Sequence, residues 1–250
     1  MIHRFAYGTD PLNFGDLRLP ESGVSSPVAI VIHGGFWRST FGLDYINPFC
    51  EALTAAGIAT WNLEYRRLGN TGGGWPGTLD DVAAGADHIG SLATQFNLDL
   101  NRVIAIGHSA GGHLAFWLAS RKKALTGAIS LAGVVDLRRA WELHLSNTVV
   151  ADFLGGSPEE VPDRYDFASP IEQLPLGIPQ RLFHGTADSS VPYEISERYA
   201  HAAQLCGDNA ELITLEKSGH FELVDPRTRE FALARESALK QLSRGAVKQF

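Results

Sequence analysis

The segment GHSAG, residues 107–111, places a serine between two glycines directly after a short apolar run and before a helical pattern. In this strand-turn-helix context GxSxG is typical of a nucleophile elbow, whose glycines allow the tight turn that exposes the serine above a sheet. A serine hydroxyl is a weak nucleophile at neutral pH, so it needs a nearby base and a carboxylate that orients this base. Ser109 is therefore the predicted nucleophile. The alternative interpretation is a glycine-rich turn with an incidental serine.

Two later loops contain an acid and a base in the order that this chemistry requires. Each loop follows a predicted strand: HGTADSS contains Asp188, and KSGHFE contains His220. The order Ser, Asp, His is that of hydrolases with a nucleophile elbow. Because the carboxyl ends of parallel strands open onto one crevice, we expect the three side chains to meet there. Asp136 and Asp166 are alternative acids if the last strands lie elsewhere.

The segment HGGFW, which begins at His33 and follows another apolar run, would stabilise a negatively charged tetrahedral intermediate. Backbone N–H groups are suitable donors for such an oxyanion, and glycine lets them approach without a Cβ in the way. We expect donors from Gly34 and Gly35, or from Gly35 and Phe36. Ala110, the residue after the serine, would supply a further donor. His33 is interpreted as a brace for this loop.

Short apolar runs alternate with longer helical patterns around these motifs. This alternation predicts an α/β fold, a mostly parallel, twisted sheet with helices on both faces. The expected strands are 28–33, 58–65, 103–108, 127–133, 181–185 and 211–216, with 13–19 as an antiparallel edge strand. The expected helices are 43–56, 78–96, 110–120, 194–205 and 226–242, the last with Pro226 at its first position.

Residues 136–175 interrupt the alternation with helical fragments, several prolines and no clear strand. A stretch of this length inside a compact domain is usually functional, as a lid or a binding loop. We therefore expect residues 1–250 to form a single domain in which 136–175 is a small lid or cap insertion over the site.

The composition, with 44% hydrophobic and 20% charged residues, is that of an ordinary globular domain. A net charge of −7 without a basic run argues against a nucleic-acid partner. The longest strongly apolar stretch, 28–32, is too short to span a membrane, so no membrane partner is expected. Two cysteines and an N-terminus without a secretory pattern favour a cytoplasmic location. Because metal-ligand spacings and phosphate-binding loops are not found, we expect no metal and no cofactor.

The motifs HGGFW and GHSAGG together resemble those of the α/β-hydrolase superfamily, in particular the esterase/lipase group with an HGG motif. The chain is most similar to hydrolases of the kynurenine formamidase (arylformamidase) type, where an aromatic residue follows HGG. The segment 63–82 also resembles the strand-to-helix connection of this group. The resemblance covers nearly the whole chain and implies an α/β-hydrolase fold.

The motifs and the resemblance predict a serine hydrolase that cleaves a small-molecule carboxylic ester, or a formyl or aryl amide, through an acyl-enzyme. Ser109 would attack the carbonyl, His220 would transfer the proton, and Asp188 would stabilise the imidazolium. Hydrolysis of esters and of amides needs the same three residues, so their presence does not show which of the two is the substrate. The alternative is a non-catalytic ligand-binding or interaction protein on a hydrolase scaffold.

Aromatic residues in loops near these motifs are candidate walls of a substrate cleft. We expect an apolar cleft that takes a small acyl group, limited by Phe36 and Trp37, and a larger aromatic or hydrophobic leaving side. The alternative is that several of these rings fill the core. The candidate substrate-binding residues are Phe36, Trp37, Trp75, Trp141, Phe167, Tyr193 and Phe221.

Overall fold

The computed structural model describes residues 2–21, 25–122 and 124–243. Within these ranges the chain forms an eight-stranded sheet with the strand order β1-β2-β4-β3-β5-β6-β7-β8. The pairs β1-β2 and β2-β4 are antiparallel, and the other neighbours are parallel. The strands are β1 (Ile2–Ala6), β2 (Phe14–Arg18), β3 (Ser26–Ile32), β4 (Ala59–Leu63), β5 (Leu98–His108), β6 (Gly127–Leu131), β7 (Gln180–Gly185) and β8 (Ala210–Leu215).

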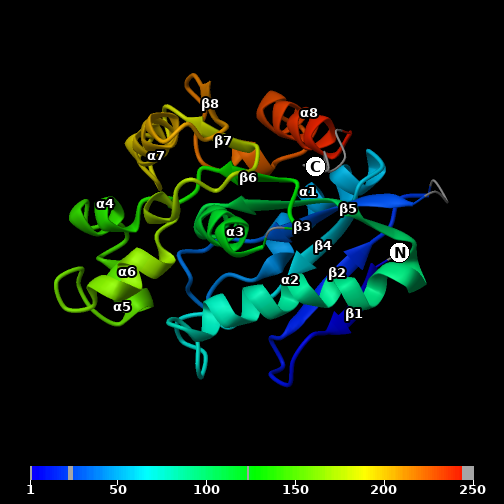
Figure 1. The fold of residues 1–250 in the computed structure, drawn as a ribbon, viewed down its shortest axis with the longest axis horizontal. Coiled ribbons are helices and arrows are strands. Elements are labelled where there is room, and N and C mark those ends of the chain that lie inside the picture. The colour runs from blue at the N-terminus through cyan, green and yellow to red at the C-terminus, as the bar shows by residue number, and fades with distance from the viewer. Residues whose placement is uncertain (1, 22–24, 123, 244–250) are drawn as a thin grey trace.

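Helices cover both faces of the sheet (Figure 1) and divide the buried side chains into two cores. Consecutive residues of β3 alternate between them, since Ile30 belongs to one core and Val31 to the other. Burial on both faces is the reason that the strand sequences are apolar at consecutive positions. One face carries α1 (Asn47–Ala55) and α8 (Arg229–Ser243), and the other carries α2 (Gly77–Phe96), α3 (Ala110–Arg121) and α7 (Glu194–Leu205).

The predicted alternation of strands and helices is confirmed, but the position of the edge strand is corrected. Residues 14–18 run antiparallel to β4, as expected, yet β1 pairs with their other side and forms the edge. The five residues of β1, IHRFA, are exposed or only half-buried. A strand this short and this polar has no clear hydrophobic pattern by which the sequence could reveal it.

The start of the last helix is also corrected, because α8 begins at Arg229 and not at Pro226. The Thr228 hydroxyl accepts a hydrogen bond from the amide of Phe231 at 3.1 Å, which is the contact of an N-cap residue. Short 3-10 segments also occur, at η1 (Leu43–Ile46), η2 (Pro170–Gln173) and η3 (Glu222–Val224). In the described part of the chain, every helix is too short or too polar to cross a membrane.

The segment between β6 and β7 folds into short helices that pack into the main core. Phe153 is fully buried and stacks on Trp37, with ring centroids 4.7 Å apart. Arg38 Nη2 donates to the carbonyl of Ser146 at 2.8 Å, which ties the segment to the loop after β3. The function of this segment as a lid stays a prediction. Its helices are α4 (Leu137–Glu142), α5 (Val149–Leu154) and α6 (Pro162–Ala168).

Candidate active site

Ser109 occupies a sharp turn between β5 and α3. Its φ of 58° and ψ of −123° lie outside the regions that L-residues usually adopt, as expected for a nucleophile elbow. The flanking glycines are required by space, because a Cβ on Gly107 would clash with the carbonyl of Gly111, and one on Gly111 with the carbonyl of Ile32. The Ser109 amide donates to the carbonyl of Leu131 at 2.8 Å. This hydrogen bond therefore fixes the turn to the neighbouring strand β6.

Asp188 and His220 meet beyond the ends of β7 and β8. The Nδ1 atom of His220 lies 2.6 Å from Oδ2 of Asp188, and both side chains are almost completely buried. The other carboxylate oxygen of Asp188 accepts hydrogen bonds from the amides of Ser190 at 2.8 Å and Val191 at 2.9 Å. These two amides orient the carboxylate toward the imidazole. The fold thus brings together the acid and the base that the sequence predicts.

His184, a buried residue of β7, is a second histidine at this carboxylate. Its Nε2 lies 2.9 Å from the carbonyl of Val191 and 3.4 Å from Oδ2 of Asp188, while its Nδ1 lies 2.7 Å from Oγ of Ser196. Burial by itself would raise the pKa of Asp188, but the hydrogen bonds from His184 and His220 hold this pKa well below its usual range. Asp188 is therefore ionised at neutral pH. A histidine inside a strand belongs to no recognisable motif, so this role of His184 could not be read from the sequence.

The two alternative acids are engaged elsewhere. Asp136 caps α4 by accepting from the amide of Arg139 at 2.9 Å, and its other oxygen pairs with Arg198 Nε at 3.0 Å. Asp166 is exposed and pairs with an arginine of α4 at 2.6 Å. Among the described residues, neither carboxylate is hydrogen-bonded to His220.

The loop after β3 lies directly against Ser109. A Cβ on Gly34 would stand 2.8 Å from the Cβ of Ser109 and 2.6 Å from the carbonyl oxygen of His108, so only glycine fits this position. The Gly34 amide donates to the Tyr45 hydroxyl at 2.6 Å. This amide is therefore not free to bind an oxyanion.

The next two residues of the loop, Gly35 and Phe36, are the second of the two donor pairs predicted from the sequence. Gly35 and Phe36 have positive φ values of 109° and 50°, so the loop takes a left-handed conformation at both residues. In the described part of the chain, no acceptor is hydrogen-bonded to the amides of Gly35, Phe36 or Ala110. These three N–H groups are the available donors beside Ser109.

A buried charged cluster supports this loop from behind. His33 lies with Nδ1 2.9 Å from the carbonyl of Gly34 and with Nε2 2.9 Å from Glu64 Oε1, and Arg67 pairs with the same carboxylate at 2.8 Å. Burial by itself would raise the pKa of Glu64, but the hydrogen bond to His33 and the charges of His33 and Arg67 lower it. These contacts agree with a bracing role for His33.

The aromatic residues predicted from the sequence to line the substrate cleft differ in their burial and their packing partners. Trp37 is fully buried, so it belongs to the core and not to an accessible wall. Trp75 and Phe167 pack edge to face against each other, with centroids 5.2 Å apart. Phe221 is 60% exposed, and its ring centroid lies 5.2 Å from that of His220.

The other three aromatic candidates are partly accessible. Phe36 is half-buried in the loop beside Ser109, and Trp141 is half-buried in α4. The hydroxyl of Tyr193 is hydrogen-bonded to Oγ1 of Thr214 at 2.6 Å. Phe221 packs against the predicted base, and Phe36 belongs to the loop whose Gly34 lies against Ser109.

A groove of about 500 Å³ borders the loop that carries His220. Tyr45 and Phe221 line it from the side of the site, and Val224 and Pro226 form part of its wall. Two charged residues also line it, Asp225 and Arg227, and they form an ion pair with each other at 2.6 Å. The other lining residues are aromatic or apolar, so the groove is mainly apolar. Its size is suitable for an organic group of moderate size.

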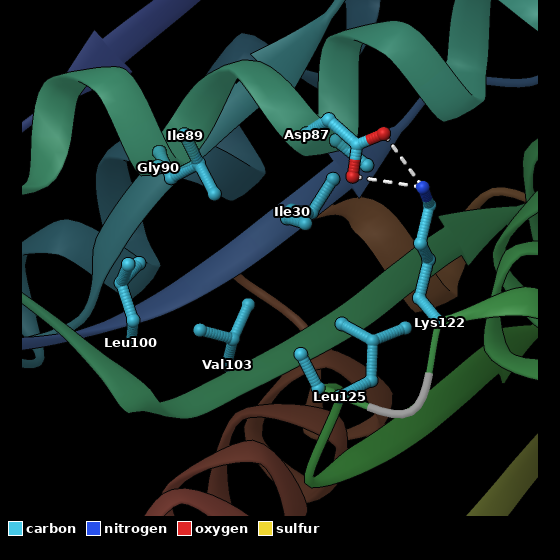
Figure 2. Close-up of a pocket in the computed structure, with 10 residues that line it drawn as sticks. Ile30, Asp87, Ile89, Gly90, Leu100, Val103, Lys122 and Leu125 are labelled. Atoms are coloured by element: carbon cyan, nitrogen blue, oxygen red, sulfur yellow. Dashed lines mark hydrogen bonds and ion pairs between the residues drawn. The ribbon is translucent and has the colours of Figure 1, made fainter.

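Another cavity, of about 180 Å³, lies between α2 and β5 (Figure 2). Leu100 and Val103 line it from the amino-terminal half of β5, and Asp87 and Lys122 form an ion pair of 2.7 Å beside it. Ser109 follows the carboxyl end of the same strand, so this cavity is not part of the candidate site.

The sequence profile of the BD-FAE family matches residues 16–202, three quarters of the chain. The chain belongs to the BD-FAE family. The matched part contains Ser109 and Asp188 and ends before His220. In this BD-FAE chain, the predicted base therefore lies on the segment that follows the family match.

Curated relatives and solved structures resemble this BD-FAE chain over most of its length. A probable isoprenylcysteine alpha-carbonyl methylesterase of Arabidopsis thaliana is 26% identical over 246 residues, 87% of this chain, and the chain spans about half, 50%, of that protein. A kynurenine formamidase of Aspergillus versicolor is 29% identical over 215 residues, 68% of this chain and 73% of the formamidase. A truncated carbohydrate esterase from gut microbiota has a TM-score of 0.83 at 22% identity, over 96% of this chain and 95% of the esterase. The predicted α/β-hydrolase fold is confirmed.

Proposed function

We propose that this chain is a serine hydrolase that cleaves carboxylic esters through an acyl-enzyme. The observation that carries the proposal is the 2.6 Å hydrogen bond between His220 and Asp188, beside a serine in an elbow conformation. Relatives described as methylesterases and as an esterase support an ester substrate. The chain covers only part of these relatives, so their own substrates are not assigned to it.

In the proposed reaction, the Ser109 hydroxyl attacks the ester carbonyl while Nε2 of His220 accepts its proton. Asp188 keeps the proton of His220 on Nδ1, so that Nε2 is free to act as the base. The protonated imidazole then delivers its proton to the leaving alcohol, and water hydrolyses the acyl-enzyme by the same route. Among the described residues the Ser109 hydroxyl is not hydrogen-bonded to His220, and such a contact commonly tightens only when substrate binds.

The oxyanion of the tetrahedral intermediate would be bound by the amides of Gly35, Phe36 and Ala110. These donors are fixed by the backbone before substrate arrives, so they stabilise the developing charge without reorganisation. The loss of one such donor costs on the order of 3 kcal/mol in the transition state.

We further propose a short acyl group and a larger aromatic or hydrophobic leaving group. Phe36 belongs to the oxyanion loop and is half-buried, so its ring would restrict the acyl side, whereas Trp37 is excluded from this role by its burial. The apolar groove beside Phe221 would accept the leaving side. The similarity to a kynurenine formamidase supports the inclusion of a formyl amide among the candidate substrates.

Covalent labelling tests the serine mechanism directly. A fluorophosphonate probe should modify the wild-type protein at Ser109, as located by peptide mass spectrometry, and Ser109→Ala should not react. Ser120→Ala is the matched control, because that hydroxyl is hydrogen-bonded to a backbone carbonyl within α3. A correctly folded wild-type protein that resists labelling would indicate a non-catalytic binding protein instead.

A substrate panel tests the acyl preference separately. N-formylkynurenine and nitrophenyl esters of acetate, butyrate and a long fatty acid should be compared by kcat/KM. We expect the shortest acyl groups to react fastest. The best turnover for the long-chain ester would contradict the proposed acyl site while leaving the serine mechanism intact.

A further inference from the structure

We propose that Tyr45 and His108 are positioning residues that tie the oxyanion loop to the loop of the catalytic base. This inference rests on the function proposed above. Three hydrogen bonds form a continuous chain: Gly34 N to Tyr45 Oη at 2.6 Å, Tyr45 Oη to His108 Nδ1 at 3.0 Å, and His108 Nε2 to the carbonyl of His220 at 3.0 Å. The residue after His108 is Ser109, so the chain includes the side chain of the residue that precedes the nucleophile.

Protons along this chain have one consistent arrangement for a neutral imidazole. The Gly34 amide can only donate, and the carbonyl of His220 can only accept. His108 must therefore carry its proton on Nε2 and accept on Nδ1. The Tyr45 hydroxyl accepts from Gly34 and donates its single proton to His108, so every member of the chain is satisfied.

The environment of His108 keeps its imidazole neutral. Burial and the neighbouring charge of His220 together lower the pKa of His108 to about 3, against the smaller opposing effects of its hydrogen bond to the His220 carbonyl and of the charge of Asp188. The charge of His184 also lowers the pKa of His108. Tyr45, which lies in η1, is hydrogen-bonded to the imidazole of His108. Burial also raises the pKa of the Tyr45 hydroxyl, so this group stays protonated.

Close packing makes the chain a rigid connection between the loops. The rings of His108 and His220 have centroids 4.5 Å apart, and those of Tyr45 and His108 are 5.8 Å apart. Removal of the Tyr45 hydroxyl would leave the Gly34 amide and the His108 Nδ1 without partners in a buried region. An unsatisfied buried group costs more than the hydrogen bond itself contributes.

Both ends of the chain lie next to groups that act in the proposed reaction. Gly34 precedes Gly35, the first proposed oxyanion donor, and the carbonyl of His220 belongs to the proposed base itself. Small displacements of reacting groups strongly reduce rates even where substrate binding is unchanged. Tyr45 and His108 should therefore influence kcat through the positions of these two loops.

The Tyr45→Phe variant tests the first half of the chain. Since one hydroxyl supports two hydrogen bonds, we expect kcat for nitrophenyl acetate to fall by about ten- to a hundredfold. KM should stay within about twofold, because the ring and its packing remain. Tyr199→Phe is the matched control: this fully buried hydroxyl donates to Gln180 Oε1 at 2.6 Å, away from the site. An equal loss of kcat in both variants, or a change confined to KM, would overturn the inference.

Substitutions of His108 separate the two contacts of its ring. His108→Asn keeps an acceptor for Tyr45, His108→Gln keeps a donor toward His220, and His108→Leu keeps neither, so kcat should be lowest in the leucine variant. If the chain acts as a unit, Tyr45→Phe combined with His108→Leu should be no slower than His108→Leu alone within about threefold. Fully multiplicative effects would show that the two residues act separately.

Histidine NMR provides a test that does not require turnover. The ¹⁵N shifts of His108 should report the neutral Nε2–H tautomer at neutral pH, and Tyr45→Phe should shift its Nδ1 and the ring resonances of His220. If the wild-type protein does not hydrolyse esters, the proposed function is contradicted. The NMR spectra would still show whether the hydrogen bonds from Gly34 through Tyr45 and His108 to His220 exist. An Nδ1–H tautomer, or His220 resonances unchanged by Tyr45→Phe in a folded variant, would overturn the inference.

Discussion

The Nδ1 atom of His220 lies 2.6 Å from Oδ2 of Asp188, although 32 positions separate the two residues in the chain. The parallel strands β7 and β8 bring them together, because Gly185 pairs with Leu215 and the loops that follow leave the same edge of the sheet. The turn at Ser109 follows β5 at that edge. Three distant segments therefore converge through the direction of the strands.

Asp188→Asn should lower kcat by roughly 10³–10⁴-fold with a small effect on KM. The amide oxygen can still accept from Ser190 and Val191, which directs the amide NH₂ group toward His220. Nδ1 of His220 would then have to accept, and its proton would move to Nε2, where the base must be free. Steady-state kinetics on a nitrophenyl ester measure this loss.

Asp166→Asn is the control for this substitution. Asp166 lies on α6, is exposed, and pairs with Arg138 at 2.6 Å. Because an exposed ion pair contributes little, we expect activity within about twofold of wild type. A comparable loss of kcat in the two variants would contradict the assignment of Asp188.

Gly34→Ala should reduce kcat by at least about a hundredfold while the protein still folds. The new Cβ would stand 2.6 Å from the carbonyl oxygen of His108 and 2.8 Å from the Cβ of Ser109, so the loop must move away from the nucleophile. Gly90→Ala is the control, because no atom beyond the neighbouring residues and the backbone of α2 itself lies within 4 Å of the added Cβ. That variant should keep full activity and gain about 0.5–1 kcal/mol of stability. Normal kcat in Gly34→Ala would place the oxyanion site elsewhere.

The free energy of unfolding should decrease as the pH falls from about 6.5 to about 4. Burial lowers the pKa of His113 to about 4 and that of His108 to about 3, whereas unfolded histidines titrate near 6.5. In this range the unfolded chain binds protons that the folded protein does not. Each histidine therefore removes up to about 1.4 kcal/mol of stability per pH unit.

Urea unfolding across this pH range measures the slope. His113→Asn should make it shallower, since the asparagine does not titrate and its oxygen can still accept from the Trp37 indole. His201→Gln, on the exposed side of α7, should leave the slope unchanged. A slope identical in wild type and His113→Asn would refute this origin of the acid sensitivity.

Trp37→Ala and Phe221→Ala should separate stability from substrate recognition. Trp37 is fully buried and stacks on Phe153, so its truncation should cost about 3–5 kcal/mol. Phe221 is 60% exposed beside the groove, and its truncation should change stability by less than about 0.5 kcal/mol. We expect Phe221→Ala to raise KM for esters with an aromatic leaving group. An unchanged KM would remove Phe221 from the proposed leaving-group site.

Local pattern alone was enough to predict several parts of this protein. The alternation of apolar strands and helices is a property of short segments, and it identified the layered fold. GxSxG requires its glycines because the elbow leaves no space for a Cβ, so Ser109 could be selected without knowledge of the surroundings. The order of Asp188 and His220 along the chain selected the acid and the base before their contact was known.

The tertiary structure decided which groups are available for chemistry and which are already engaged. Trp37 and Phe36 are neighbours in one motif, but only packing shows that the first is buried in the core. Two amides of the same loop also differ in whether they are available as donors. The Gly34 N–H donates to the Tyr45 hydroxyl, whereas the Gly35 N–H has no partner among the described residues. Hydrogen bonding and burial depend on segments far apart in the chain, and a local pattern carries no information about them.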